Sequence, residues 1–193
     1  MTAHHPASTT TASTSGPLIR PGAADDVPAV LAMLDAAIVW MNARGNTEQW
    51  GTTPYSRKRG GVERVQEYFT ECEPFVAERD GVPAGALVLH TGPSPRMPIA
   101  PAGEPERYVR LLVSDRRHAG RGIGAALLAH AVRETRRAGA GLLRVDCWAG
   151  EEGRLVSFYE RNGFTRSEEF HVGAWPGQVL TRRVGRHEDG PGR

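Results

Sequence analysis

The segment that decides the fold is Arg110-Leu111-Leu112-Val113-Ser114-Asp115-Arg116-Arg117-His118-Ala119-Gly120-Arg121-Gly122-Ile123-Gly124-Ala125-Ala126-Leu127-Leu128. It begins as an apolar run typical of a buried strand and passes through a polar turn into three alternating glycines. A helix is expected to follow from about Gly122 to Ala138. Glycines allow close backbone approach, and the N–H groups of a first helical turn attract phosphate oxygens. The segment therefore predicts an anion-binding loop between a strand and a helix.

The rest of the chain supplies alternating strands and helices around this segment. Asp25 or Asp26 is expected to cap the first helix, which Gly45 ends, and Arg79-Asp80-Gly81 is a turn typical of a β-hairpin. Five prolines make the stretch from Thr91 to Pro105 a surface loop. The order is β-α-α-β-β-β-α-β-α-β-β. The expected strands are 18–20, 75–78, 85–90, 108–113, 142–148, 164–172 and 178–184, and the other helices are 62–70 and 154–161.

Length and composition predict one domain, at 18–184. The 193 residues are 39% hydrophobic and 24% charged, enough for a single core. Residues 1–17 are rich in Thr, Ala and Ser and predict a disordered tail, and 185–193 predict a flexible one. No apolar run of about 18 residues and no signal-like N-terminus are found, so we expect a cytoplasmic protein without a membrane partner.

Metal and nucleic acid are not expected as partners. Cys72 and Cys147 are far apart and lack metal-ligand spacing, so no metal site is predicted. The net charge of +2 is too small to require nucleic acid. Only Lys58 is a lysine among the 24 basic residues. Such a bias is more typical of genomic base composition than of chemistry, which lowers the weight of any single arginine.

Two kinds of protein use a glycine loop of this type. Gly120-x-Gly122-x-x-Ala125 fits the dinucleotide fingerprint, and Asp146 follows about 20 residues later, so an NAD(P)-dependent oxidoreductase is one interpretation. Against it, residues 114–119 separate the strand from the glycines, and a hairpin precedes the unit. The remaining chain is also too short for a second nucleotide-binding half.

The other interpretation is a resemblance to the GNAT superfamily of acyl-CoA-dependent N-acyltransferases, which extends from about Leu18 to Val184. The chain is similar to its Arg/Gln-x-x-Gly-x-Gly/Ala signature at Gly122 and Gly124 and departs from it at Ala119. The resemblance implies an α/β fold. Its central sheet is mixed and mostly antiparallel, it is flanked by helices, and a splayed pair of parallel strands forms the acyl-CoA cleft.

A second block, from Leu155 to Phe164, resembles the family's helix that carries a tyrosine beside the cofactor sulfur. Tyr159 takes that position, and Glu152 replaces an asparagine that often contacts pantetheine. The resemblance implies acetyl-CoA as co-substrate. The residues expected to bind it are Leu111, Leu112, Val113, Arg116, Arg117, His118, Ala119, Gly120, Arg121, Gly122, Ile123, Gly124, Ala125 and Arg154.

The implied reaction is direct attack of an amine on the thioester in a ternary complex. The backbone N–H of Val113 is expected to polarise the carbonyl and Tyr159 to protonate the departing thiolate, because a phenol and a thiol have similar pKa values. Glu106 and Asp146 are the candidate bases, and each is also readily interpreted as a structural carboxylate.

The acceptor is expected to be a small-molecule or peptide amine. Trp40, Trp50 and Trp148 are candidates for its pocket, and core packing explains them equally well. A homodimer is compatible with the resemblance. A protein that binds acyl-CoA without turnover remains a third interpretation beside the acetyltransferase and the oxidoreductase.

Overall fold

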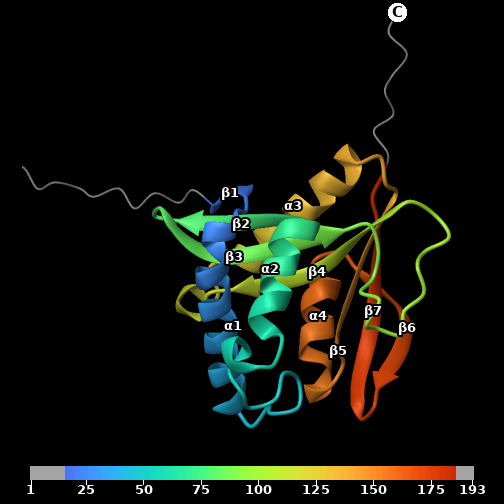
Figure 1. The fold of residues 1–193 in the computed structure, drawn as a ribbon. Coiled ribbons are helices and arrows are strands. Elements are labelled where there is room, and N and C mark those ends of the chain that lie inside the picture. Colours follow the sequence, from blue (N-terminus) through green and yellow to red (C-terminus); the bar gives the residue numbers. More distant parts are fainter. Residues whose placement is uncertain (1–15, 186–193) are drawn as a thin grey trace, which may run out of the picture.

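The computed structural model describes residues 16–185, and in them seven strands form a single sheet (Figure 1). The strands are β1 Leu18–Pro21, β2 Glu73–Arg79, β3 Val82–His90, β4 Glu106–Ser114, β5 Leu142–Trp148, β6 Thr165–Val172 and β7 Trp175–Arg183. The helices are α1 Val27–Asn42, α2 Gly61–Glu71, α3 Ile123–Arg137 and α4 Arg154–Arg161. The predicted tails lie outside the described residues apart from 16, 17 and 185.

The strand order is β1-β2-β3-β4-β5-β7-β6, and among the described strands β4–β5 is the only parallel pair. The predicted fold class, a mixed and mostly antiparallel sheet flanked by helices, is confirmed. A dinucleotide-binding fold is built on a mostly parallel, doubly wound sheet. The oxidoreductase interpretation therefore has no support in this topology.

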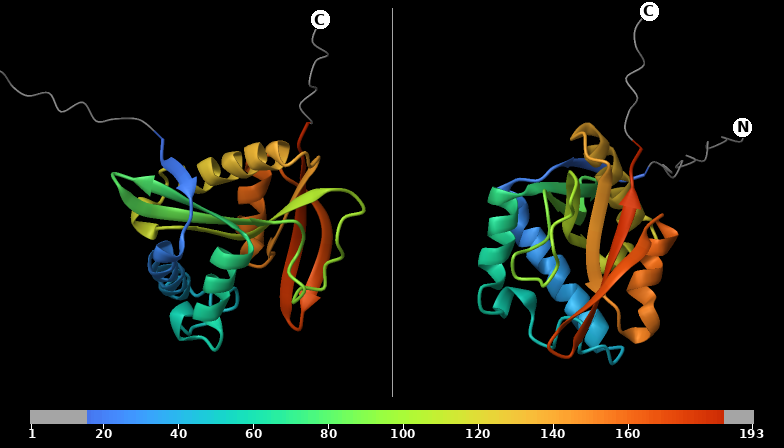
Figure 2. Two further views of the ribbon diagram at one scale, coloured as in Figure 1. Left: turned by 45° about the horizontal axis from the view of Figure 1, so that its top comes forward. Right: turned by 90° about the vertical axis from the view of Figure 1, so that its right-hand side faces the viewer.

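Two apolar clusters hold the helices on opposite faces of the sheet. Helices α3 and α4 share one cluster with the sheet, built around Leu127, Leu143 and Tyr159. Helices α1 and α2 share the other, built around Leu34, Val65 and Val88. Figure 2 shows α3 on one side of the strands and α1 and α2 on the other. Fully burying side chains of this size contributes about 1.5–3 kcal/mol each, so both faces stabilise the sheet.

The sequence locates most elements to within two or three residues, including β5 and α4. It also places the N-cap of α1 correctly at Asp26, although no side-chain hydrogen bond caps this helix. Asp26 occupies the capping position, and its carboxylate is held by Arg20, with Nη2–Oδ1 at 2.7 Å and Nη1–Oδ2 at 2.8 Å. An arginine two elements away competes for the same oxygens, and local spacing does not reveal it.

Strands β4 and β5 pair over a short length and then part. The paired residues are Glu106–Val109 of β4 and Leu142–Val145 of β5, four pairs in all. Beyond them β4 continues beside β3, and β5 continues beside β7. The pairing of β3 with β4 is also irregular here, since Val88 opposes Leu111 and Leu89 opposes Val109, which leaves Arg110 as a bulge. The two strands therefore diverge in a V, called the fork below.

The proline-rich loop at 91–105 is attached to the sheet at both ends. At its start, Arg110 donates to the carbonyl oxygens of Gly92 and Pro93, each at 2.8 Å. Near its end, Arg144 donates to the carbonyl oxygen of Ala100 at 3.1 Å. Ile99 packs with residues of β6 and β7. The loop therefore covers the sheet beside the fork.

No helix in the described part of the chain is long and apolar enough to cross a membrane. Nor do residues 16–185 contain a group of three or more His, Cys, Asp or Glu side chains placed to hold a metal ion.

Candidate active site at the strand fork

The backbone of β4 presents two amides to the open side of the fork. Asp115 N donates to Ala84 O of β3 at 2.9 Å. Because alternate residues of an antiparallel strand direct their backbone groups to opposite edges, the Val113 amide also faces β3, and the Leu112 and Ser114 amides face β5. The prediction that Val113 supplies the N–H in the cleft is therefore wrong. The predicted donor is one residue off, because the neighbouring amides of Leu112 and Ser114 are the ones that face the open side.

The glycine loop, residues 115–125, includes the connection from β4 and the first turn of α3. Just before α3, its backbone takes a conformation that glycine adopts most easily. Gly120 and Gly122 both have φ of 74°, in the left-handed region, and open space surrounds the position where each would carry a Cβ. Gly124 differs, because its added Cβ would lie 3.1 Å from Phe158. Its role is close packing of α3 against α4.

The first turn of α3 offers backbone donors. No side chain caps this helix, and the first amide with an acceptor in the helix is that of Ala126, which donates to Gly122 O at 2.9 Å. Within the described residues the amides of Ile123, Gly124 and Ala125 thus have no partner from the helix itself. Ala125 is exposed and the Ile123 side chain is buried, so the backbone carries the chemistry here. Free amides thus open α3, and anion binding by them stays a prediction.

The arginines of the glycine loop are engaged in different ways. Arg116 stacks on the Trp40 ring of α1, with its guanidinium carbon 3.8 Å from the ring centroid. Arg117 donates to Asp115, with Nη2–Oδ2 at 2.6 Å. Arg121 is exposed beside Gly120. Two of the three predicted charges thus contact other residues of the protein, and among the described residues Arg121 forms no ion pair or cation–π contact.

The other predicted cofactor contacts surround the loop. Leu111 and Leu112 are half-buried in β4, His118 is half-buried and Ala119 is exposed. Arg154 begins α4 and lies 3.6 Å from the Glu151 carboxylate. The contacts of these residues with acetyl-CoA stay predictions.

Tyr159 lies on α4 in the apolar cluster under the fork. Its ring makes edge contacts with Phe158 and Phe164, at centroid distances of 5.3 and 5.7 Å. Burial raises the pKa of the phenol well above its ordinary value, and the neighbouring Cys147 and Asp146 raise it further. The hydroxyl therefore stays protonated at neutral pH, but the raised pKa makes it a weaker acid and removes the match to a thiol on which the predicted role rests.

Asp146 is the one residue of β5 that is not fully buried, and it follows directly on the paired segment. Tyr108 donates its hydroxyl to Asp146 Oδ1 at 2.8 Å across the fork. Burial raises the pKa of the carboxyl, although the Tyr108 hydrogen bond and the charges of Arg110 and Arg144 oppose the shift. A carboxylate with a raised pKa is a stronger base. Tyr108, which the sequence marks only as a strand residue, is the partner that sequence reasoning missed.

Glu106, the second candidate base, is held in place by other groups. It is 6% exposed, its Oε2 lies 3.3 Å from Arg144 Nη1, and its Oε1 accepts from Ala102 N at 3.0 Å. It sits at the paired end of β4, away from the opening. These contacts give Glu106 a role in attaching the proline-rich loop, and the two predicted bases are not brought together.

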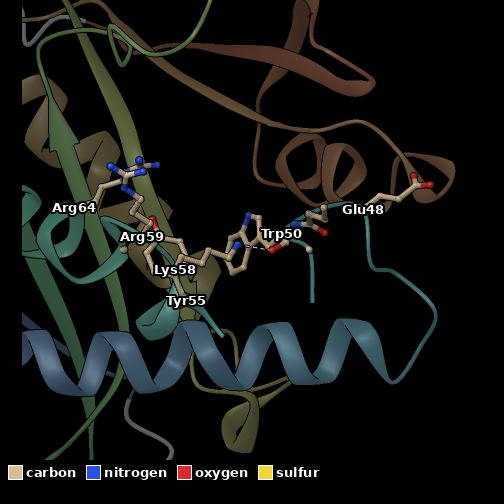
Figure 3. Close-up of a pocket in the computed structure, with 9 residues that line it drawn as sticks. Glu48, Trp50, Tyr55, Lys58, Arg59 and Arg64 are labelled. Atoms are coloured by element: carbon tan, nitrogen blue, oxygen red, sulfur yellow. Dashed lines mark hydrogen bonds between the residues drawn. The ribbon is translucent and has the colours of Figure 1, made fainter. Parts of the chain in front are cut away.

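The three tryptophans are separated. Trp40 stacks with Arg116, as described above, and Trp50 lies in the connector between α1 and α2. Trp148 ends β5 with its ring against the Gly150 backbone, and its Nε1 is buried without a hydrogen-bond partner. Trp50 alone lines a cavity among the described pockets. Sequence reasoning missed the basic residues that share this cavity with it. The cavity, called the basic pocket below, is shown in Figure 3 and is lined by Glu48, Gln49, Trp50, Gly51, Tyr55, Lys58, Arg59, Gly61 and Arg64.

The connector between α1 and α2 touches both arms of the fork. Asn46 Nδ2 donates to Glu151 Oε2 at 2.9 Å, just before α4. Trp175 Nε1 of β7 donates to Gln49 O at 3.0 Å. Because α1 and α2 cover the β4 side, these contacts bridge the fork at its open end.

Comparison with known protein families gives one match that covers most of the chain. The sequence profile of the acetyltransferase (GNAT) family matches residues 33–164, which include β4, the glycine loop and α4. Comparison with curated protein sequences finds no match.

Solved structures share the fold. A GCN5-related N-acetyltransferase from Rhodopseudomonas palustris superposes with a TM-score of 0.66 at 18% identity, over 88% of this chain and 97% of its own. A ribosomal-protein-alanine N-acetyltransferase from Brucella melitensis has a TM-score of 0.63 at 21% identity, over 86% of this chain and 99% of its own. A Salmonella typhimurium protein solved with its cofactor acetyl-CoA gives 0.62 at 16% identity, over 90% and 97%. At these identities the similarity concerns the fold.

Proposed function

Because the chain belongs to the acetyltransferase (GNAT) family, we propose that it transfers an acetyl group from acetyl-CoA to a primary amine. The observation that carries the proposal is the fork itself. Strands β4 and β5 part after four residue pairs, and the glycine loop with its unpartnered amides begins where β4 ends. One end of the fork thus suits a diphosphate, and the other suits a reacting thioester.

The residues present fit an acyl-CoA. The amides of Ile123, Gly124 and Ala125 would hold the pyrophosphate oxygens, and the left-handed Gly120 and Gly122 keep side chains out of the space that the phosphates need. Ala119 replaces the signature's usual Arg or Gln, and exposed Arg121 supplies charge nearby. Acetyl-CoA brings an acetyl group already activated as a thioester.

The chain's own groups would then place and move protons. The Leu112 amide, on the open edge of β4, donates a hydrogen bond to the thioester oxygen. Asp146, with its pKa raised by burial, takes a proton from the amine directly or through water, and the neutral amine attacks the carbonyl carbon. Tyr159, protonated at neutral pH, gives its proton to the departing sulfur.

The test is release of free thiol from acetyl-CoA in the presence of an amine panel, together with thermal melts. Acetyl-CoA is expected to raise the melting temperature and NADH to leave it unchanged. At least one amine is expected to release thiol, and Tyr159→Phe is expected to lower kcat by about 100-fold. Stabilisation by acetyl-CoA without thiol release from any amine would instead favour a binding protein. A cytoplasmic location and a homodimer stay predictions.

A further inference from the structure

The basic pocket carries an excess of positive charge that the protein does not neutralise. It has a volume of about 400 Å³, and Lys58, Arg59 and Arg64 line it with one carboxylate, Glu48. Figure 3 shows the two guanidinium groups at one end and Glu48 at the opposite end, directed away from them. Within residues 16–185 none of the three cations forms an ion pair.

Among the cations of the basic pocket, Arg64 is the one with a buried donor, its Nε, that lacks a partner in the described residues; outside the pocket, Arg107 Nε and Arg116 Nε are in the same state. Buried polar groups are almost always satisfied, and an unsatisfied charged donor is costly. By contrast, the Nε and Nη2 of Arg110 donate to carbonyl groups of the proline-rich loop. Arg64 thus has donors to spare for a ligand oxygen.

The other walls suit a small organic molecule. Trp50 and Tyr55 provide aromatic surface, and Lys58 donates to the Trp50 carbonyl oxygen while lying 5.5 Å from the Tyr55 ring centroid. Burial lowers the pKa of Lys58, and the Arg64 charge lowers it further. An anion between the two cations would relieve that repulsion, because opposite charges favour the ionised form.

The pocket adjoins the fork. Trp50 and Tyr55 belong to the same apolar cluster as Leu111, which lies in β4 beyond the point of divergence. Tyr68 of α2 packs against the same cluster. The pocket and Leu111 of β4 therefore lie on the same face of the sheet, which is the face that α1 and α2 cover.

Building on the proposed acetyl transfer, we propose that the acceptor is a small primary amine that also carries a carboxylate, with Arg64 and Lys58 binding the carboxylate. The amine then reaches toward Asp146, and the aromatic walls contact the carbon skeleton between the two ends. Arg64 acts as a specificity-determining residue, and the acetyl-CoA site is independent of it.

The experiment uses amino acids and their primary amides as matched probes, because each pair differs only in the carboxylate. The wild-type protein is expected to acetylate acids with a kcat/KM at least about 10-fold above that of their amides. Arg64→Gln is expected to lower kcat/KM for acids by about 10- to 100-fold and to leave the amides and the KM for acetyl-CoA unchanged. Arg64→Lys keeps the positive charge and loses the planar guanidinium that can bind both carboxylate oxygens. Its kcat/KM for acids is expected to lie between those of the wild type and Arg64→Gln.

Arg57→Gln is the matched control, because Arg57 is exposed in the same connector and does not line the pocket. It is expected to leave both rates unchanged. Equal use of acids and amides by the wild type, or an Arg64→Gln loss shared by the amides or by acetyl-CoA, would overturn the proposal. Thermal melts with each probe alone measure binding to the pocket without turnover. If the protein releases no thiol but acids stabilise it, and Arg64→Gln removes that stabilisation, the reaction fails and the pocket proposal stands. Absence of any such stabilisation would count against the pocket itself.

Discussion

The glycine loop and the basic pocket offer different groups to the ligands proposed for them. The loop offers backbone amides, while Arg117 is paired with Asp115 and Arg116 stacks on Trp40 with its Nε buried and unpartnered among the described residues. The pocket offers side chains, and the Nε of Arg64 is likewise buried without a partner in this part of the chain. Backbone recognition tolerates many side-chain changes, whereas side-chain recognition changes with one substitution.

The largest expected effect comes from the backbone side. Gly122→Val would strain a residue with φ of 74° and place a branched side chain where the phosphates need space. We expect acetyl-CoA affinity to fall by about 100-fold, which corresponds to about 3 kcal/mol, in a calorimetric titration.

Gly139→Val provides the control for this strain. Gly139 follows the other end of α3 with φ of 69° and equally open surroundings. It carries the same backbone cost, about 1–2 kcal/mol of stability, and its affinity for acetyl-CoA should match the wild type. Equal losses of affinity in the two variants would show that the loop acts only through folding.

The second prediction separates the two candidate bases on the side-chain side. Asp146→Asn is expected to lower kcat by about 100-fold with little change in KM for acetyl-CoA. Glu106→Gln is expected to reduce the free energy of unfolding by about 3 kcal/mol, because it breaks the buried pair with Arg144. Steady-state kinetics and urea unfolding of both variants check this. A catalytic loss confined to Glu106→Gln would reverse the assignment.

The third prediction concerns pH and uses the same residue. Burial raises the pKa of Asp146 in the folded state, so the folded protein holds this proton more tightly than the unfolded chain. The resulting stability is fully present below the unfolded pKa and is lost as pH rises through the folded pKa. As pH rises from acid to neutral, the melting temperature should therefore fall less steeply for Asp146→Asn than for the wild type. Parallel curves would contradict the burial of this charge.

The smallest effect is expected next to α4, where the cofactor side meets the connector. Glu152 has φ of 57°, a left-handed conformation that glycine adopts without strain, and its side chain is exposed. Glu152→Gly should raise the free energy of unfolding by about 1 kcal/mol. Glu152→Ala, which keeps the Cβ and the strain, should give no such gain in the same denaturant titration.

The same contrast shows what the sequence reveals. The glycine loop can be recognised in the sequence because its glycines, the preceding apolar strand and the following helix are consecutive. The element order also follows from local patterns, whereas the sheet topology is implied by the family resemblance. The acceptor side is assembled from the connector, α2, β4 and β5, and Tyr108–Asp146 spans 38 positions. Among 23 arginines (24 basic residues less Lys58), nothing local distinguishes Arg64 from the rest. The error at Val113 has a similar origin, because the edge that an amide faces depends on the partner strand.

The bridge formed by Asn46 and Gln49 has a mechanical consequence. Strands β4 and β5 pair at one end only, so the distance between their other ends depends on contacts outside the pair. Here those contacts come from the connector segment between α1 and α2, which is remote in sequence from both strands. The gap available to the reactants can therefore be widened or narrowed over evolutionary time by altering that segment, with the buried sheet left as it is.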